Sequence, residues 1–406
     1  MKKIMILGAG VYQLPILQKA AEMCEVILVA PMVSQDFKEY ADKIYDLDLR
    51  RQDEILEIAQ KEKIDGIITD QTDIPVRTMA YVADNMGLPG IGYDTACLFT
   101  DKGKMRQKLE ELGIPVLPNK TIQSLEEAVH FFESLEGAAI IKPADNQGSR
   151  GVYKISSRME LEKYFASSKS ESSTGQVVIE KYAEGREFVV EAMSLNYEYQ
   201  ELILGDTIYF DIENAFAAKN RIFPSNASEE ICKKVSLLNE RIIKGFGLKQ
   251  GISHSEYVMD GDEVYLIETA ARGGGVFISS DLIHLGAGVN TEEFLIRIAL
   301  GELNVMPEVQ KGQCHCGYMA FYLPQGTVKS IQGIESIKNY DFVHRNILYT
   351  IHTGMQIGTI EDKTSRFSII VSGKSAEELE EHMEQIRKTL LIEVDTEEGV
   401  KYPIWE

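Results

Sequence analysis

His254-Ser-Glu-Tyr-Val-Met-Asp-Gly-Asp-Glu-Val-Tyr-Leu-Ile-Glu268-Thr-Ala-Ala-Arg272 is the most informative stretch of this chain. Apolar and polar residues alternate on both sides of Asp260-Gly-Asp262, which predicts a β-hairpin. A three-residue loop would bring Glu256 and Glu268 onto one face as diagonal neighbours, about 7–8 Å apart. Two carboxylates at that separation, with Arg272 four residues further on, suit a hard cation that holds a polyphosphate.

Two other interpretations of this hairpin stay open. A two-residue loop would turn Glu256 and Glu268 to opposite faces, and a shared cation would then be excluded. The hairpin could also lie at a sheet edge with both acids in solvent, as charged residues on edge strands often do. The hairpin alone does not decide between these cases, so the rest of the chain has to.

Composition bounds the class of protein. The 406 residues are 44% hydrophobic and 26% charged, which is typical of a soluble globular protein with several structural units. A net charge of −21 argues against a nucleic-acid-binding surface. We expect no membrane span, because no run of about 18 apolar residues occurs. Five scattered cysteines, an odd number, favour the reducing cytoplasm over a disulfide framework.

The pattern along the chain predicts a mixed fold. Apolar runs at 2–8, 25–30, 66–69 and 89–92 read as strands with helical segments between them, which indicates a parallel α/β layer. Further strands follow, and a serine-rich stretch at 167–175 reads as a polar loop. The last hundred residues combine strands with a helix over 376–390, an α+β pattern.

Two local motifs resemble a dinucleotide-binding turn and a metal site, but the residues around them do not support either. Gly8-Ala-Gly10 follows the first strand, but Gln13 takes the place of the third glycine of a dinucleotide fingerprint, and no acid ends the second strand. An NAD-dependent enzyme is therefore a weak alternative. Cys314-His-Cys316 has no second pair at zinc-finger spacing, and alternation along a strand explains it.

Four segments share the residue types that handle a nucleoside triphosphate. In the glycine loop, small residues let backbone N–H groups approach phosphate oxygens, and a lysine adds positive charge. The segments, in order, are Asp101-Lys102-Gly-Lys104, the loop from Lys142 to Val152, the stretch from Glu180 to Glu187, and the hairpin. Each could be ordinary surface structure by itself, but together and in this order they point to one site.

The order of these segments resembles that of the ATP-grasp superfamily, whose members include biotin carboxylase, the carbamoyl-phosphate synthetase large subunit and bacterial L-amino-acid ligases. The resemblance covers essentially the whole chain, and the segment Arg366–Gly373 is similar to the C-terminal domain of the amino-acid ligase branch. It implies a Rossmann-like pre-ATP-grasp domain over 1–96 and a two-lobed ATP-grasp domain over 97–302, with lobes at about 97–175 and 176–302. A C-terminal α+β domain would span 303–406.

The resemblance also implies roles for individual residues. Mg²⁺, or Mn²⁺ as a substitute, would be bound by Glu256 and Glu268. Arg272 and Lys142 would act in catalysis, with the backbone N–H groups of 273–275 stabilising an oxyanion. Residues expected to contact ATP are Lys102, Lys142, Gly148, Ser149, Gly151, Glu180, Lys181, Ala183 and Glu187. Ala270 departs from the family, which usually has an asparagine there, so a second ion would be held less firmly.

The expected activity is that of an ATP-dependent carboxylate–amine ligase, which forms an amide through an acyl phosphate and releases ADP and phosphate. Its substrates would be a small carboxylic acid and an amine, and relatives of this architecture are commonly homodimers. His254 could serve as a base or simply as a hairpin residue. Two alternatives remain: a bicarbonate-using carboxylase or carbamoyl-phosphate-type enzyme, and a non-catalytic nucleotide-binding protein that kept the fold.

Overall fold

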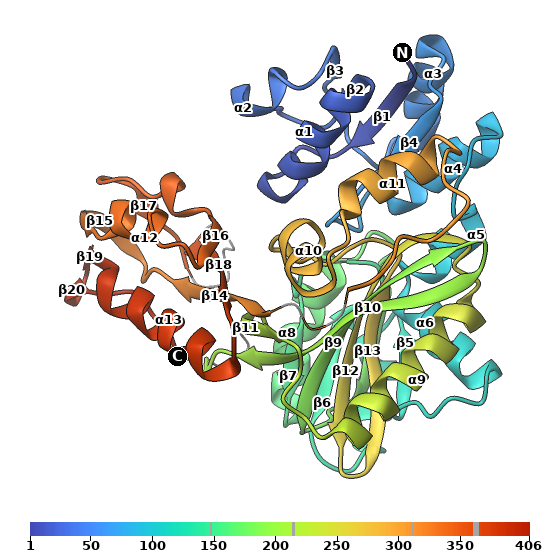
Figure 1. The fold of residues 1–406 in the computed structure, drawn as a ribbon. Coiled ribbons are helices and arrows are strands. Elements are labelled where there is room, and N and C mark those ends of the chain that lie inside the picture. Colours follow the sequence, from blue (N-terminus) through green and yellow to red (C-terminus); the bar gives the residue numbers. More distant parts are fainter. Residues whose placement is uncertain (147, 213–215, 311, 313, 360–364) are drawn as a thin grey trace.

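The computed structural model describes residues 1–146, 148–212, 216–310, 312, 314–359 and 365–406. Residue 147 of the predicted glycine loop and residues 213–215 of the segment before β11 therefore lie outside the described part. The described residues form four sheets. Figure 1 shows an N-terminal unit in blue, a central body that is mainly cyan to yellow, and a C-terminal unit in orange to red.

The N-terminal unit is built on a parallel sheet with the strand order β3-β2-β1-β4. Its strands are β1 (Lys3–Leu7), β2 (Glu25–Val29), β3 (Lys43–Tyr45) and β4 (Gly66–Ile68). Its helical segments are η1 (Val11–Gln13), α1 (Leu14–Met23), α2 (Gln35–Lys38), α3 (Gln52–Glu62) and α4 (Val76–Met86). The predicted parallel α/β layer is confirmed, because strands covered on both faces read as continuous apolar runs.

One strand predicted in this region is wrong. Residues 89–92 form no strand, because Gly92 has a φ of +84° and leads directly into α5 (Tyr93–Leu98). The next helix, α6 (Lys102–Glu111), begins after Asp101, whose carboxylate accepts a hydrogen bond from the backbone N–H of Lys104. This cap satisfies a backbone N–H donor in the first turn and fixes the position of Lys102, the first residue of the helix.

A small antiparallel sheet follows, with the order β5-β8-β6-β7. It contains β5 (Asn119–Ile122), β6 (Ala139–Pro143), β7 (Tyr153–Ile155) and β8 (Val177–Lys181), and it packs against α7 (Leu125–Glu133) and α8 (Arg158–Ser170). The loop predicted to start at Ser167 is wrong over its first residues. Helix α8 continues there because Leu161, Phe165 and Ser168 are buried at helical spacing.

The largest sheet is antiparallel and has the order β13-β12-β9-β10-β11-β14-β18-β16. Its strands are β9 (Arg186–Leu195), β10 (Glu198–Tyr209), β11 (Ala218–Phe223), β12 (Gln250–Asp260), β13 (Glu263–Ala270), β14 (His315–Tyr322), β16 (Val343–Asn346) and β18 (Arg366–Gly373). Strands from before and after residue 303 join this one sheet. Helix α9 (Glu229–Phe246) packs on one side of it, as Figure 1 shows.

The hairpin of β12 and β13 differs from the predicted one in a way that matters. Asp260 pairs with Glu263, so the loop has two residues, and the three-residue loop is wrong. A β-bulge at Ile267 then shifts the register, so that Tyr257 faces Leu266 while Glu256 faces Glu268 directly. Because a bulge inserts one unpaired residue, it returns the two carboxylates to the same face.

The remaining elements complete the connection to the C-terminal unit. After the hairpin come η2 (Ile278–Leu282), α10 (Ile283–Ala287) and α11 (Thr291–Ala299), and α11 packs against α1 and β4 of the N-terminal unit. The C-terminal unit adds α12 (Ile334–Lys338), η3 (Leu348–Thr350) and the helix α13 (Ala376–Thr389), which matches the prediction for 376–390. Its second sheet has the order β17-β15-β19-β20, with β15 (Gly326–Gln332), β17 (Gln356–Ile357), β19 (Leu391–Thr396) and β20 (Gly399–Lys401).

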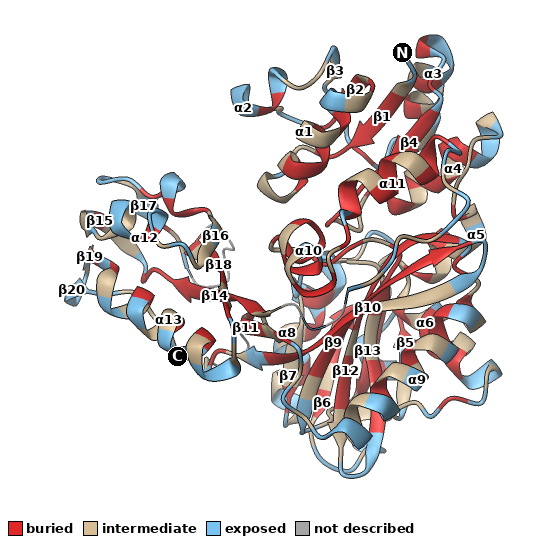
Figure 2. Cartoon of the chain, in the orientation of Figure 1, coloured by how far each residue is buried: buried red, intermediate tan, exposed pale blue. Residues whose placement is uncertain are grey.

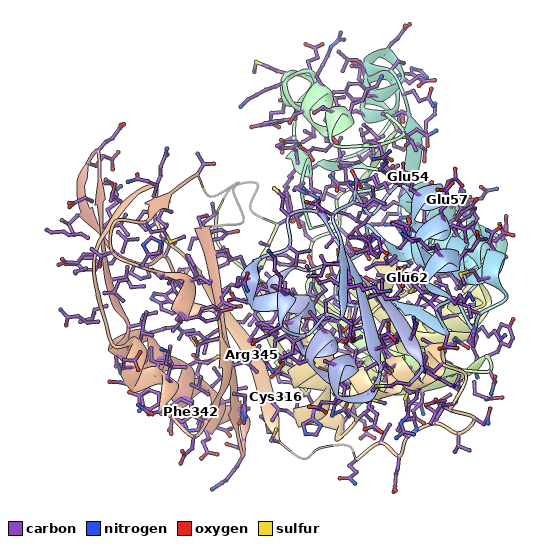
Figure 3. All side chains as sticks on the ribbon, turned by 90° about the horizontal axis from the view of Figure 1, so that it is seen from above. Glu54, Glu57, Glu62, Cys316, Phe342 and Arg345 are labelled. Atoms are coloured by element: carbon purple, nitrogen blue, oxygen red, sulfur yellow. The ribbon has the colours of Figure 1, made fainter. Side chains whose placement is uncertain are left out.

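Among the described residues, the largest buried cluster includes Ile4 of β1, Val189 of β9 and Ile369 of β18, and three smaller clusters lie apart from it. Figure 2 shows the strands of the parallel sheet and of the large sheet as mostly buried. One ion pair at the junction joins Arg345 of β16 to Asp281 of η2 at 2.8 Å, and Figure 3 labels Arg345 where the C-terminal unit meets the rest of the chain. Among the described helices, none has the length and apolar character that a membrane crossing requires.

Candidate active site

One face of the large sheet gathers the polar residues of the site. Directly paired residues of an antiparallel sheet point to the same side. The register therefore places Glu187 and Glu191 of β9, His254 and Glu256 of β12, and Glu268 of β13 on a single face. Arg221 of β11 and Tyr318 of β14 pair with each other and continue that face toward the C-terminal unit.

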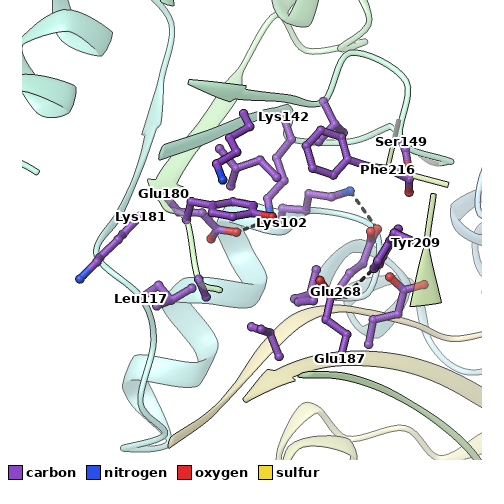
Figure 4. A pocket seen from close by; sticks show the side chains of 18 of the residues that line it. Lys102, Leu117, Lys142, Ser149, Glu180, Lys181, Glu187, Tyr209, Phe216 and Glu268 are labelled. Carbon is purple, nitrogen blue, oxygen red and sulfur yellow. Dashed lines mark hydrogen bonds and ion pairs between the residues drawn. The ribbon is translucent and has the colours of Figure 1, made fainter. Parts of the chain in front are cut away.

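A cavity of about 450 Å³, the first cavity, lies between this face and the small sheet. Figure 4 shows its walls, with Lys102, Lys142 and Glu268 directed into it. Predicted residues that line it are Lys102, Lys142, Ser149, Glu180, Lys181, Ala183, Glu187, Glu256 and Glu268. Gly148 lines the neighbouring second cavity, and Gly151 lines neither of the two. The structure thus brings together nearly all residues expected to contact ATP.

A buried charge cluster fixes the wall of the first cavity that β8 forms. Lys142 forms an ion pair with Glu180, and Arg106 of α6 donates to both oxygens of Glu180 at 2.9 and 3.2 Å. Burial alone would raise the pKa of Glu180, but the Arg106 and Lys142 charges lower it to about 2. Burial lowers the pKa of Lys142. The Glu180 side chain therefore orients Lys142 at the wall of the first cavity.

Arg106 is a site residue that the sequence did not reveal. Besides Glu180, it donates to the carbonyl oxygen of Ile267 at 2.7 Å. Ile267 is the bulge residue of the hairpin, so one guanidinium connects the small sheet to the bulge that aligns Glu256 and Glu268. Its signal in the sequence is weak: a single arginine four residues after Lys102, in an otherwise charged helix.

Lys102 and Glu187 both line the first cavity. The Lys102 ammonium donates to the carbonyl oxygen of Asn146 and to Glu268, both at 2.8 Å, and its side chain is 7% exposed. Glu187 accepts a hydrogen bond from the Tyr209 hydroxyl at 2.7 Å. Burial raises the pKa of Glu187 to about 7. Tyr209 was not among the predicted site residues.

Glu256 belongs to a second charge cluster. Arg221 forms an ion pair with it, and His254 Nε2 lies 3.1 Å from its Oε1. His254 Nδ1 contacts Glu191, a fully buried carboxylate. Burial alone would lower the pKa of His254, but Glu191 raises it. His254 Nε2 also lies 2.9 Å from Arg221 Nη1, so the ring is tied to Glu191, Glu256 and Arg221 within one cluster.

Arg272 and the glycines after it are engaged by two distant segments. The Arg272 guanidinium donates to both oxygens of Asp73 at 2.8 Å, across 199 residues of sequence. The N–H groups of Gly273 and Gly274 donate to Asp70 and Glu191 at 3.0 and 3.1 Å. The expected oxyanion site at 273–275 is therefore wrong for these two donors, because buried carboxylates already accept from them.

The second cavity has a volume of about 860 Å³ and adjoins the first. Its walls come from the N-terminal unit, the glycine loop, the large sheet and the C-terminal unit. Ser149, Arg150, Phe216, Glu256 and Glu268 line both cavities. The two carboxylates thus stand at the junction, with one cavity on each side.

Glu256 and Glu268 have the chemistry that Mg²⁺ requires. Mg²⁺ prefers oxygen ligands and commonly takes one or two carboxylates, with phosphate oxygens and water completing its shell. No group of three or more His, Cys, Asp or Glu suited to a metal occurs among the described residues. Two facing carboxylates beside a cavity lined by lysines fit an ion that arrives with a polyphosphate.

Comparisons with known proteins agree with this geometry. Residues 135–281 match the model of the ATP-grasp domain. The carbamoyl phosphate synthase large chain of Clostridium acetobutylicum is 28% identical over 59% of this chain and 22% of its own length. The alanine–anticapsin ligase of Bacillus subtilis is 27% identical over 55% of this chain and 51% of its own. The chain thus spans about a fifth of the one relative and half of the other.

A solved structure extends the likeness to the whole chain. The crystal structure of an L-amino acid ligase from Bacillus licheniformis superposes with a TM-score of 0.83, at 21% identity, over 97% of this chain and 98% of that one. At that identity the superposition shows the fold alone. Together with the matched domain, it supports the resemblance seen in the sequence: residues 135–281 carry an ATP-grasp domain, and the whole chain has the fold of this solved structure.

Proposed function

We propose that this protein is an ATP-dependent ligase that joins a carboxylic acid to an amine and releases ADP and phosphate. The observation that carries the proposal is the junction at Glu256 and Glu268, which line both the first and the second cavity. A nucleotide in the first cavity would present its terminal phosphate at this junction. A carboxylate in the second cavity would then be placed to attack it.

The residues of the first cavity would bind and orient ATP. Lys102 and Lys142 would offset the charge of the phosphates, the backbone near Glu180, Lys181 and Ala183 would contact the adenine, and Glu187 would accept from ribose hydroxyls. Glu256 and Glu268 would hold Mg²⁺, and the bound ion would neutralise charge on the transferring phosphoryl group. Ser149 and Arg150 of the glycine loop would cover the phosphates from the side shared with the second cavity.

The residues of the second cavity would act on the acid. Arg272, held in place by Asp73, lines the cavity and would donate to the acyl phosphate formed when the carboxylate attacks the γ-phosphorus. The amine then attacks the acyl carbon, phosphate leaves, and the amide forms. Fixing the arginine in advance lowers the reorganisation needed at the reaction step.

A phosphate-release assay with Mg-ATP and paired amino acids and small acids tests the proposal. We expect phosphate release that depends on both partners, with a condensed product by mass spectrometry. A parallel reaction with bicarbonate and ammonia covers the similarity to the carbamoyl phosphate synthase large chain. Phosphate release with bicarbonate alone would favour that chemistry, and ATP binding without any ADP formation across the panel would contradict a ligase.

A further inference from the structure

The arginines of the second cavity differ in their partners. Besides Arg150 on the glycine loop, three arginines line this cavity: Arg221, Arg272 and Arg366. Arg221 pairs with Glu256, and Arg272 pairs with Asp73. Each of these two positive charges is thus balanced by a carboxylate of the protein. Arg366 is the exception, and it is the first residue of β18 in the C-terminal unit.

Arg366 is held by neutral groups. Its Nη2 donates to the carbonyl oxygen of Ala218 and lies 3.5 Å from the Tyr318 hydroxyl, and its guanidinium carbon stands 5.6 Å from the centre of the Tyr318 ring. Its Nε is buried without a hydrogen-bond acceptor. Within the described ranges of the chain, no carboxylate lies at ion-pair distance from it.

A half-buried guanidinium without a counter-charge is costly for a folded protein. Removing a cation from water is compensated only in part by neutral acceptors, so an anion that enters the cavity gains a favourable partner. The planar fork of arginine matches a carboxylate better than any other common group. With the neighbours Tyr12 and Phe367 also lining the cavity, the position suits a carboxylate on a partly apolar small molecule.

The place of Arg366 in the sheet separates it from the reacting centre. Strand β18 lies two strands beyond β11, which carries Arg221, and adjacent strands are about 4.8 Å apart. Arg366 lines the second cavity and does not line the first, whereas Glu256 and Glu268 line both. A carboxylate on Arg366 would therefore not be the one that receives the phosphoryl group.

We propose that Arg366 binds an unreacted carboxylate of a substrate in the second cavity, so that the ligase takes a substrate with a carboxylate remote from the bond it forms. This inference rests on the proposed function. The carboxylate can come from two sources, the second acid group of a dicarboxylic acid or the α-carboxylate of an amino acid that supplies the amine. The shared chemistry is a charge-assisted pair with the Arg366 guanidinium.

A binding experiment tests the site without requiring turnover. The wild-type protein, Arg366→Met and the control Arg158→Met, an exposed arginine of α8, are heated in Mg-ADP with each of the C3–C6 dicarboxylic acids and each amino acid. We expect at least one compound to raise the Tm of wild type and of the control, and the shift to be lost in Arg366→Met. Arg366→Lys, which keeps the charge, checks that the fold tolerates the position. An equal shift in Arg366→Met, or no shift in wild type with any compound, would overturn the inference.

Turnover then distinguishes the two sources. For pairs that release phosphate with wild type, either the amino acid is replaced by its amide or the dicarboxylic acid by its monoamide. The reactant bound by Arg366 should show a KM about 10- to 100-fold higher when its free carboxylate is removed, and Arg366→Met should abolish that difference. The same KM change in Arg366→Met as in wild type would contradict the assignment. Absence of phosphate release in wild type would count against the proposed function and leaves the binding result to decide on Arg366.

Discussion

The two cavities of this protein are built in different ways. The first cavity draws its charged residues from short segments of the ATP-grasp region, and a buried cluster of Lys142, Glu180 and Arg106 fixes them. The second cavity draws its residues from every unit, with Asp73 from the N-terminal unit and Arg366 from the C-terminal unit. The predicted motif segments supply most residues of the first cavity, whereas most residues of the second cavity lie outside them. The first cavity can therefore be recognised by motif, and the second has to be understood from its own contacts.

The largest expected effect tests the junction that both cavities share. Glu268→Gln removes a carboxylate charge that the proposed Mg²⁺ site needs, so phosphate release should fall by about 100-fold or more. Circular dichroism should show an unchanged fold. Glu263→Gln, an exposed position on the same strand, is the matched control and should retain activity. Wild-type turnover in Glu268→Gln would refute the metal assignment.

A smaller effect is expected within the first cavity alone. Lys142→Met removes a charged donor to the phosphates and leaves Glu180 paired with Arg106. The affinity for ATP, measured by calorimetry, should fall about 10- to 100-fold. Lys163→Met on the surface of α8 provides the control. An unchanged ATP affinity would show that Lys142 only stabilises the wall of the cavity.

A change in the second cavity should instead affect the KM for the acid and leave the affinity for ATP nearly unchanged. Asp73→Asn leaves the Arg272 guanidinium without its bidentate partner, so Arg272 is no longer held in one orientation. We expect the KM for the acid to rise about tenfold while the affinity for ATP stays within a factor of two. Weaker ATP binding with an unchanged KM for the acid would contradict the assignment of ATP to the first cavity and of the acid to the second.

The smallest effect concerns a buried acid outside both cavities. Burial raises the pKa of Glu292 to about 8 from its ordinary value of 4.5. Between these two values the folded state binds more protons than the unfolded state, so stability falls as the pH rises from about 4.5 to about 8. Glu292→Gln should remove this loss.

The Tm of the wild-type protein and of Glu292→Gln, each at pH 5 and pH 9, measures this loss of stability. The drop between the two pH values should be smaller in Glu292→Gln by about 2 °C, an order-of-magnitude expectation for a protein of this size. Glu293→Gln, at the adjacent and more exposed position, should behave as wild type. An equal drop in Glu292→Gln would show that Glu292 titrates near its ordinary pKa.

The sequence by itself indicated the resemblance to the ATP-grasp superfamily, the parallel N-terminal layer and nine of the residues that line the first cavity. These follow from local signals: continuous apolar runs, small residues in a glycine loop, and lysines and acids at recognisable spacing. It did not determine the hairpin correctly, because the bulge at Ile267 has no distinct local signature. A two-residue loop alone would have excluded the site that the bulge restores.

Only the tertiary structure decided which charges are balanced and which are left for a ligand. Arg106 reaches Glu180 and Ile267 across 74 and 161 residues, and Arg272 reaches Asp73 across 199. Such partners are set by how the sheets and helices pack, since side chains far apart in sequence meet only after the backbone has folded. The same packing leaves Arg366 beside neutral groups, a property that no pattern of neighbouring residues encodes.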